Sequence, residues 1–514
     1  MAAATLTSRV LGMVREIVYS GFMGVGWVNG AFQLAFTIPN LFRRLLGEGA
    51  LTASFIPIFK EKERTATPKE MWRAANAVIS GLLVAAGAIT VLAIVGITIA
   101  LAVGVFPAKT DLMLRLVRVM FPYMLLVCLA AIFMGILNAR GHFFIPATGT
   151  VMMNVVLIAS VFLIAPLLGQ ELHKQIFGLA IGVLLAGLAQ ALFQLPTLRG
   201  EGFRYQWVSP WGEPTVKRVV HQMIPGTIGV AAFQLNVAVT QSIAFAVDPS
   251  ILASFNFAVR LMELPQGVFG ISLATFLLPT LSGLAADKKF GEFRGLLRHG
   301  LEHLVFINVL ASVLLFLLAE PIIRLLFQHG RFDEQATQGV TEALVFMAPG
   351  LVLFSVNNIL ARAFYALGDT RTPMRISVFC LAVNLVFAMV LVTRYRQGGL
   401  ALANTMSAAI NLSLLLYALR RKLGRLELSA LRTTLLKTGG AVILAGLVAW
   451  GGHRWWNQAI GHAGLWRQLG DVFVPMTAAS LVYLVVTLQL RVASAAEMGT
   501  MLFRRLGFKG AKLG

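Results

Sequence analysis

The chain has 514 residues, of which 58% are hydrophobic and only 13% charged, whereas soluble domains carry about 25% charged residues. This composition excludes a soluble globular domain, because no polar stretch is long enough to bury a core of its own. Apolar runs of roughly 20 residues, each long enough to cross a bilayer, recur along the chain. We therefore predict an all-α polytopic membrane protein. An outer-membrane barrel would instead show short alternating segments.

About fourteen transmembrane helices are expected from the length and spacing of these apolar runs. In chain order they cover 9–34, 38–59, 76–106, 113–138, 146–168, 176–198, 218–247, 252–284, 300–327, 338–367, 372–393, 398–420, 435–452 and 470–490. Of the 43 Lys and Arg, 27 lie in one set of alternate loops and the C-terminal tail, and seven lie in the opposite loops. The positive-inside rule then places both termini in the cytoplasm. It also accounts for the net charge of +21 without a nucleic-acid partner.

The first predicted span contains three charged residues, Arg9, Arg15 and Glu16. Arg9 and Glu16 are seven positions apart, so they lie on nearly the same helical face. A charge at the centre of a bilayer costs roughly 3 kcal/mol or more unless it faces a partner or a wet cavity. The three residues are therefore predicted to line the entrance of a polar cavity. The alternative is that they lie at an interfacial helix end and reach water.

The second predicted span carries Arg43, Arg44 and Glu48. Arg44 and Glu48 have the i,i+4 spacing of a helical ion pair, and Arg43 is a candidate anion ligand. Interrupted spans in transporters line cavities, since their freed backbone groups need water or protein. The residues that interrupt this span are Pro39, Gly47, Gly49 and Pro57.

The eighth predicted span carries a further pair, Arg260 and Glu263, at i,i+3, and Pro265 and Gly267 follow it. If the two halves of the chain face each other, this pair lies across from the Arg43 region. Arg362 is a weaker candidate, because it lies towards a span end. Arginines outnumber acids among these intramembrane charges, which favours an anionic substrate; arginine binds phosphate with two parallel hydrogen bonds and stays charged when buried.

The chain also resembles itself. The matched positions are Pro122 and Pro349, Gly141 and Gly368, and Pro146 and Pro373, each 227 residues apart. Each repeat holds six spans, an even number, so the two copies point the same way and form a parallel repeat. We therefore expect an N-lobe at 1–200, a C-lobe at 201–425, and two extra spans with the tail at 426–514.

No signature of a soluble enzyme is present, so neither catalytic residues nor an enzymatic activity are predicted. The two cysteines, Cys128 and Cys380, lie inside apolar runs and are interpreted as small core residues. No metal site is predicted.

Five stretches resemble the MurJ (MviN) family of lipid II flippases, within the multidrug/oligosaccharidyl-lipid/polysaccharide exporter superfamily. They are SRVLGMVRE (8–16), IPNLFRRLLGEGALTASFIPI (38–58), RLMELPQGVFGISLATFLLPTLS (260–282), LFQHGRFD (326–333) and ALGDTRTP (366–373). The resemblance covers nearly the whole chain.

This resemblance implies two six-helix lobes around a V-shaped, cationic central cavity, with the last two helices forming a groove for an undecaprenyl tail. It implies that the substrate is lipid II, the undecaprenyl-pyrophosphate-linked disaccharide-pentapeptide. The substrate would move from the cytoplasmic to the periplasmic leaflet of a bacterial inner membrane by alternating access. No cofactor is implied, and the energy would come from the membrane potential or an ion gradient. Membrane lipids and cell-wall synthesis proteins are further candidate partners.

The resemblance also implies roles for the intramembrane charges. The substrate-binding residues would be Arg9, Arg15, Arg43, Arg44 and Arg260, with Arg15, Arg43 and Arg260 on the pyrophosphate and Arg9 near the gate. The gating or orienting residues would be Glu16, Glu48 and Glu263. One position departs from the family: many members carry an Asp where this chain has Gly30, which can neither titrate nor bind a cation.

Other functions stay open from the residues alone. A flippase for another polyprenyl-pyrophosphate-linked glycan would use the same cationic site. A cation-coupled exporter of small molecules would need an acidic site, and a membrane enzyme acting on polyprenyl phosphates would need clustered Asp residues. A scaffold for cell-wall proteins would gain little from intramembrane charges.

Overall fold

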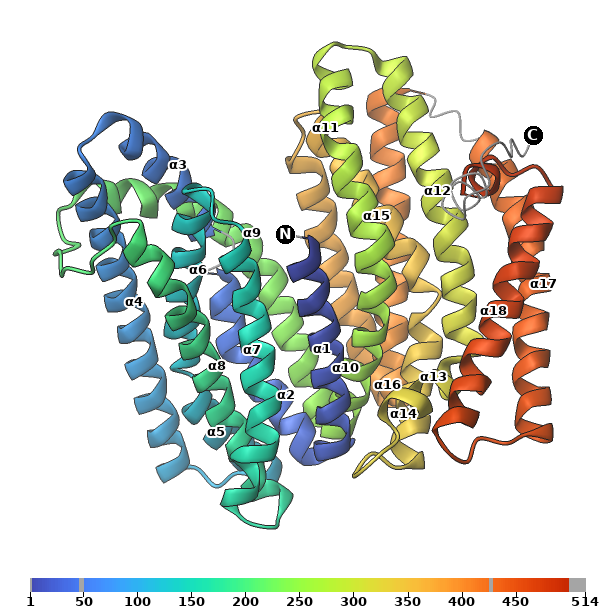
Figure 1. Ribbon diagram of the computed structural model, residues 1–514, viewed down its shortest axis with the longest axis horizontal. Helices are drawn as coiled ribbons and strands as arrows, with labels where there is room; N and C mark the ends of the chain where they lie inside the picture. Colours follow the sequence, from blue (N-terminus) through green and yellow to red (C-terminus); the bar gives the residue numbers. More distant parts are fainter. Residues whose placement is uncertain (1, 46–49, 425–428, 499–514) are drawn as a thin grey trace. The chain divides into compact units, whose positions relative to one another are not determined.

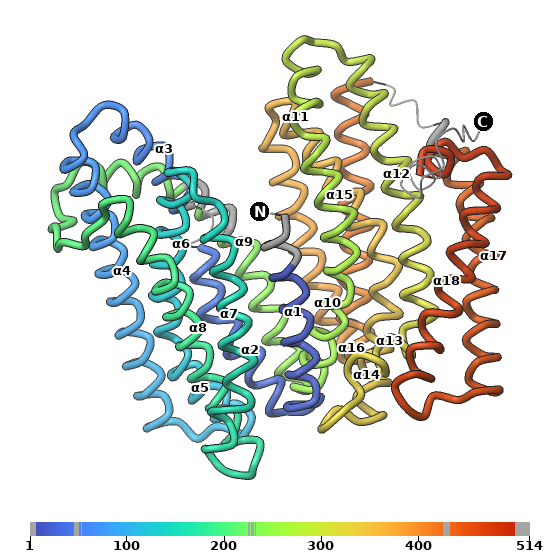
Figure 2. Tube along the Cα trace, viewed as in Figure 1, coloured from blue at the N-terminus to red at the C-terminus, as the bar shows by residue number. Residues whose placement is uncertain are grey.

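The computed structural model describes residues 2–45, 50–424 and 429–498, which are almost entirely helical and contain no strand (Figures 1 and 2). Within these ranges, eight helices are long and apolar enough to cross a membrane, or up to ten if each bent helix pair is one span. The predicted all-α polytopic membrane fold is confirmed. The count of about fourteen spans stays a prediction from apolar run length.

Two compact units make up the chain. The first comprises Met1–Ala253 together with His329–Phe332, and the second comprises Ser254–Gln328 and Asp333–Gly514. The helices before residue 248 are α1 (Ala2–Met23), α2 (Trp27–Phe42), α3 (Ala50–Thr65), α4 (Pro68–Val103), α5 (Ala108–Met120), α6 (Tyr123–Ala139), α7 (Phe144–Leu163), the 3-10 helix η2 (Ala165–Leu168), α8 (Leu172–Gly200) and α9 (Pro214–Val247).

The remaining helices are α10 (Pro249–Pro265), the π-helix η3 (Gln266–Ile271), α11 (Ser272–Ala286), α12 (Phe290–Leu317), α13 (Ala319–Phe327), α14 (Glu334–Met347), α15 (Gly350–Ala366), α16 (Arg371–Leu423), α17 (Ser429–Ala459) and α18 (Leu465–Gln489). The compact units place α9 with the first half of the chain, whereas the internal repeat assigns it to the second. The division at 1–200, 201–425 and 426–514 rests on the repeat and stays a prediction.

The first predicted span, 9–34, is wrong as a single helix. Helix α1 ends at Met23, and α2 begins at Trp27. Between them Gly24 adopts a φ of +59°, a left-handed conformation that glycine reaches without steric cost. The buried Asn29 side chain donates a hydrogen bond to the Gly24 carbonyl and so satisfies a group freed by the turn. Arg9, Arg15 and Glu16 therefore lie on α1, and Gly30 lies on the next helix.

The internal repeat is visible in matching bends. Helices α5 and α6 meet at 40°, and α14 and α15 meet at 46°. Pro122 precedes α6 and Pro349 precedes α15, as expected because proline cannot continue a helical hydrogen-bond ladder. Gly141 and Gly368, which follow α6 and α15, have φ values of +88° and +71°. The two repeats thus place the same turns at the same positions.

Helix α16 consists of two helical segments that meet at a kink. Arg396 has φ 47° and ψ −125° inside this 53-residue element, which agrees with the predicted spans 372–393 and 398–420. Gly399 makes the sharp turn possible, because a Cβ atom there would lie 2.1 Å from the Leu391 carbonyl oxygen. The element therefore folds back through a close backbone contact that only glycine allows.

The core of the second unit packs the ends of α11, α12, α15 and α16 together. Leu281, Phe293, Ile359, Phe364 and Leu419 are fully buried there. Burying each of these large apolar side chains contributes roughly 1.5–3 kcal/mol. This cluster fixes the loop between α15 and α16, which carries charged groups described below.

Candidate functional site

A buried polar cluster surrounds Arg15 on α1. Its Nη1 donates a hydrogen bond to Asn154 Oδ1 on α7 at 3.1 Å, and its Nη2 contacts Glu16 Oε1 at 2.5 Å. Glu16 is only 6% exposed. The carboxylate and the amide therefore hold the guanidinium in place, as expected of a charge kept inside a span. Arg15 Nε is buried and makes no hydrogen bond within the part of the chain that the structure describes.

Small polar residues connect α1 to α7 on the N-terminal side of this cluster. Ser8 Oγ donates to Thr150 Oγ1 at 2.9 Å, and Asn154 Nδ2 donates to the Ser8 carbonyl oxygen at 3.3 Å. Asn154 thus bridges the α1 backbone and Arg15. Sequence reasoning missed this residue, although Thr150 and Asn154 are i,i+4 neighbours in an otherwise apolar run. A polar stripe at helical spacing was the available signal.

Arg9 does not join this cluster. Its side chain is exposed, and no hydrogen bond or ion pair links it to Arg15 or Glu16 among the described residues. The seven-residue spacing therefore brings Arg9 onto the same helix as Glu16 but not into contact with it. The role of these three residues in lining a cavity stays a prediction.

The second group of predicted residues follows α2. Arg43 and Arg44 lie in a π-helical turn at 43–45, where Arg43 is half-buried and Arg44 is exposed. This turn is the predicted break in the second span. Glu48 falls outside the described residues, so the expected ion pair between Arg44 and Glu48 stays a prediction. Thr37 fastens α2 to α9, donating a hydrogen bond to Gln241 Oε1 at 2.6 Å.

The third group belongs to the second unit. Arg260 Nη1 lies 2.7 Å from Glu263 Oε2, so the predicted i,i+3 pair is present. Both side chains are exposed, at 42% and 53%. The predicted break after Pro265 is η3, where Gly270 allows a close approach: a Cβ atom there would lie 2.8 Å from Ser355 Oγ. Glycine and a π-turn are typical of functional breaks in helices.

Gly30 explains the departure from the family pattern. It is buried on α2, and a Cβ atom there would lie 2.2 Å from the Pro249 carbonyl oxygen. Any side chain at this position would collide with backbone at the start of α10. The position of the family acid is therefore used in this chain for close packing of two helices.

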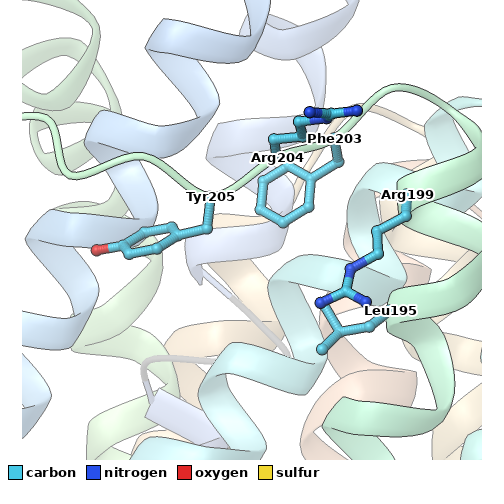
Figure 3. A pocket seen from close by; sticks show the side chains of 5 residues that line it. All are labelled: Leu195, Arg199, Phe203, Arg204 and Tyr205. Carbon is cyan, nitrogen blue, oxygen red and sulfur yellow. The ribbon is translucent and has the colours of Figure 1, made fainter.

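A separate cavity lies at the end of α8 and the loop that follows. Its volume is about 510 Å3. Figure 3 shows its lining side chains, which are Leu195, Arg199, Phe203, Arg204 and Tyr205. The cavity contains two arginines but none of the predicted site residues. Its position is anchored by hydrogen bonds from α4, since Asn76 Nδ2 donates to the Arg204 carbonyl oxygen at 2.9 Å.

Comparison with known proteins identifies the family. Residues 19–468 match the family model described as Lipid II flippase MurJ. The chain belongs to the MurJ family of lipid II flippases. A relative from Bdellovibrio bacteriovorus, named "Probable lipid II flippase MurJ", is 34% identical over 94% of this chain and 92% of its own length. The "Lipid II flippase MurJ" of Burkholderia cenocepacia is 34% identical over 87% of this chain and 88% of its own.

Solved structures show the same fold. One titled "Lipid II flippase MurJ, inward closed conformation" aligns with a TM-score of 0.76 and 22% identity, covering 98% of this chain and 99% of that chain. An inward-facing multidrug resistance MATE family transporter of the MOP superfamily aligns with a TM-score of 0.63 and 16% identity, covering 82% and 95%. MurJ family members are transporters, so the chain is not an enzyme by family.

Proposed function

We propose that this chain is a lipid II flippase that moves the lipid-linked peptidoglycan precursor across the bacterial inner membrane, from the cytoplasmic to the periplasmic leaflet. The family match over residues 19–468 carries this assignment. The basic residues concentrated in one set of loops and the tail support an orientation with both termini in the cytoplasm. Peptidoglycan synthesis and cell shape depend on this step, because the precursor is polymerised outside the membrane.

The residues proposed to bind the pyrophosphate are Arg15, Arg43 and Arg260. A guanidinium suits this task because it stays charged when buried and bonds two phosphate oxygens at once. Glu16 supports this role for Arg15 and Glu263 supports it for Arg260, since each carboxylate lies within 2.7 Å of its arginine. A carboxylate at that distance orients the guanidinium. The more highly charged pyrophosphate can then displace the carboxylate from it.

Three further residues complete the proposed site. Arg9 and Arg44 are exposed, so they would attract the anionic headgroup before it is bound. Glu48 would orient Arg44 from one helical turn away. Movement between leaflets follows from rocking of the two parallel repeats around the bound headgroup.

The energy source is the membrane potential or an ion gradient, and no cofactor takes part. Gly30 cannot supply a titratable group for ion coupling, and its contact with Pro249 leaves no room for an acid. A net positive site carries charge across the membrane as it reorients. Such movement is worth about 2.3 kcal/mol per elementary charge per 100 mV.

Rescue of a bacterium depleted of its own lipid II flippase tests the function. Accessibility of lipid II to an externally added cleaving toxin reports its leaflet. Restored growth with externally cleavable lipid II is expected. A correctly inserted, well-expressed chain that leaves lipid II protected would contradict the assignment and would favour another polyprenyl-pyrophosphate-linked glycan, whose export can be measured in the same strain.

A further inference from the structure

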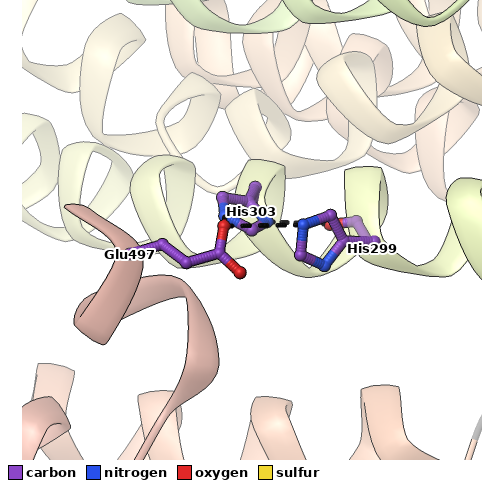
Figure 4. A group of neighbouring side chains, drawn as sticks. All are labelled: His299, His303 and Glu497. Atoms are coloured by element: carbon purple, nitrogen blue, oxygen red, sulfur yellow. Dashed lines mark hydrogen bonds and ion pairs between the residues drawn. The ribbon is translucent and has the colours of Figure 1, made fainter. Parts of the chain in front are cut away.

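Three side chains with metal-binding atoms converge beside the first half of α12. His299 and His303 are one turn apart on this helix, and Glu497 comes from residues 493–498, which follow α18 (Figure 4). Glu497 Oε2 lies 3.0 Å from His303 Nε2 and 3.5 Å from His299 Nε2. One ligand atom from each residue lies within 4.8 Å of the other two. All three residues belong to the second unit.

The distances match the edges of a metal tetrahedron. Zinc binds imidazole nitrogen and carboxylate oxygen at roughly 2.0–2.1 Å, so two such ligands in tetrahedral geometry lie about 3.3 Å apart. The two nitrogen–oxygen distances, 3.0 and 3.5 Å, lie on either side of this value. Histidines at i and i+4 project from one helical face, so both rings reach the same point without backbone change.

The hydrogen bond on the other side of the His303 ring gives independent support. His303 Nδ1 lies 3.0 Å from the His299 carbonyl oxygen, which can only accept a hydrogen bond. The proton of a neutral imidazole is therefore on Nδ1, and the Nε2 lone pair faces the Glu497 carboxylate oxygen. Two acceptors at 3.0 Å repel each other unless a proton or a cation lies between them. A backbone carbonyl that fixes the tautomer is the usual outer partner of a metal-binding histidine.

We propose that His299, His303 and Glu497 form a binding site for a divalent transition metal of the Zn²⁺ type. Two imidazoles and one carboxylate suit zinc and its neighbours, whereas Mg²⁺ and Ca²⁺ prefer oxygen ligands alone. Three protein ligands leave a fourth position for water. His299 and Glu497 are about half exposed, so the metal can enter from solvent. The sequence alone predicted no metal site, because Glu497 lies 194 residues from His303.

The consequence of binding is that the segment after α18 becomes tied to α12. In the structure, Tyr483 Oη on α18 donates to the Phe306 carbonyl oxygen on α12 at 2.8 Å, and Glu497 contacts His299 and His303. A bound metal would join Glu497 and both histidines through coordinate bonds. Arg491, an exposed residue with φ +51° between α18 and the segment 493–498, is a trypsin site that this connection would protect.

Metal titration of the full-length chain tests the site. The protein is purified with a tag that contains no histidine, stripped with a chelator, and titrated with Zn²⁺ by calorimetry and with Co²⁺ by visible absorption. One equivalent is expected, with the intense Co²⁺ bands of a tetrahedral site. H299A, H303A and E497Q should each weaken binding at least roughly 10- to 100-fold, since even outer-shell losses cost that much. H462A is the matched control and should bind normally, because His462 instead contacts Asn457.

Limited trypsin digestion, followed by intact mass, measures the proposed connection. Zn²⁺ should slow cleavage after Arg491 in the unmodified chain and in H462A but not in H303A or E497Q. Absence of one-equivalent binding in the unmodified chain would overturn the proposal. So would binding by the three site variants that is as tight as binding by the unmodified chain. The cluster would then be a proton-sharing imidazole–carboxylate group.

Discussion

Lys422 Nζ lies 2.7 Å from Asp369 Oδ2, and this pair is the repeat counterpart of His142 and Glu201, whose Nε2 and Oε1 atoms are also 2.7 Å apart. Asp369 follows His142 by 227 positions, the offset of the internal repeat, and Lys422 follows Glu201 by 221. The basic and acidic partners have exchanged places between the two copies. Each repeat therefore fastens the loop after its fourth span to the end of its sixth span through contact between a basic and an acidic side chain.

The ion pair between Asp369 and Lys422 should make the free energy of unfolding depend on pH in the acidic range. Lys422, together with the Thr372 backbone amide, lowers the pKa of Asp369 from 3.8 to about 2. A carboxyl group with a lowered folded-state pKa stabilises the protein above its unfolded pKa, and this contribution disappears as the pH falls from about 4 towards 2. D369N and K422Q should each lower the free energy of unfolding at pH 7 by about 0.5–1 kcal/mol.

A double-mutant cycle measured by thermal unfolding in detergent checks this pair. The double variant should cost less than the two single variants together, because either change alone already removes the ion pair. Strictly additive losses would show that the two residues do not interact. The acid dependence between pH 4 and 2 should be smaller in D369N than in the unmodified chain.

The function of Arg15 should depend on its hydrogen bond to the Asn154 side-chain amide. N154A removes the acceptor of the Arg15 hydrogen bond and leaves a buried guanidinium less well satisfied, at a cost of about 1–3 kcal/mol. We expect reduced rescue of the flippase-depleted strain at normal protein level. N358A is the control, since Asn358 Nδ2 donates to the Phe354 carbonyl oxygen on its own helix. Equal rescue by N154A and N358A would show that Asn154 is not part of the functional site.

Arg43 should be essential for transport. R43A is expected to abolish rescue while the protein remains inserted, because alanine removes a charge that the pyrophosphate would need. R43K should retain partial activity, since an ammonium keeps the charge but loses the two-pronged geometry. External lipid II cleavage and membrane abundance are the two measurements. Normal rescue by R43A would contradict the role assigned to this residue.

Gly30 should not tolerate the acid that many family members carry. In G30D the new Cβ atom would collide with the Pro249 carbonyl oxygen. Overpacking of this kind costs typically 1–3 kcal/mol, and burial of a carboxylate adds to it. A lower melting temperature and lower abundance are expected. G26A is the control, because a Cβ atom there has nothing within 4 Å; a G30D protein as stable as G26A would show that α2 can move away from α10.

Much of the fold follows from the sequence. Apolar run length and charge asymmetry act over neighbouring residues, so they predicted the helical membrane class. The same holds for the interruption after Pro265 and for the Arg260–Glu263 pair, whose members are one helical turn apart. The split of the first predicted span at Gly24 was missed, because the flanking sequence stays apolar through the turn.

Contacts between distant segments depended on tertiary structure. Asn154 accepts a hydrogen bond from Arg15, 139 positions away in the chain. Pro249 packs against Gly30, and Glu497 contacts two histidines of α12. None of these partners is marked by local propensity, since a side chain's neighbours across a helix interface depend on packing rather than on spacing along the chain. The sequence alone predicted which charges lie within apolar spans, and the tertiary structure decided which polar groups contact them, because burial makes a charge need a partner and only packing supplies one.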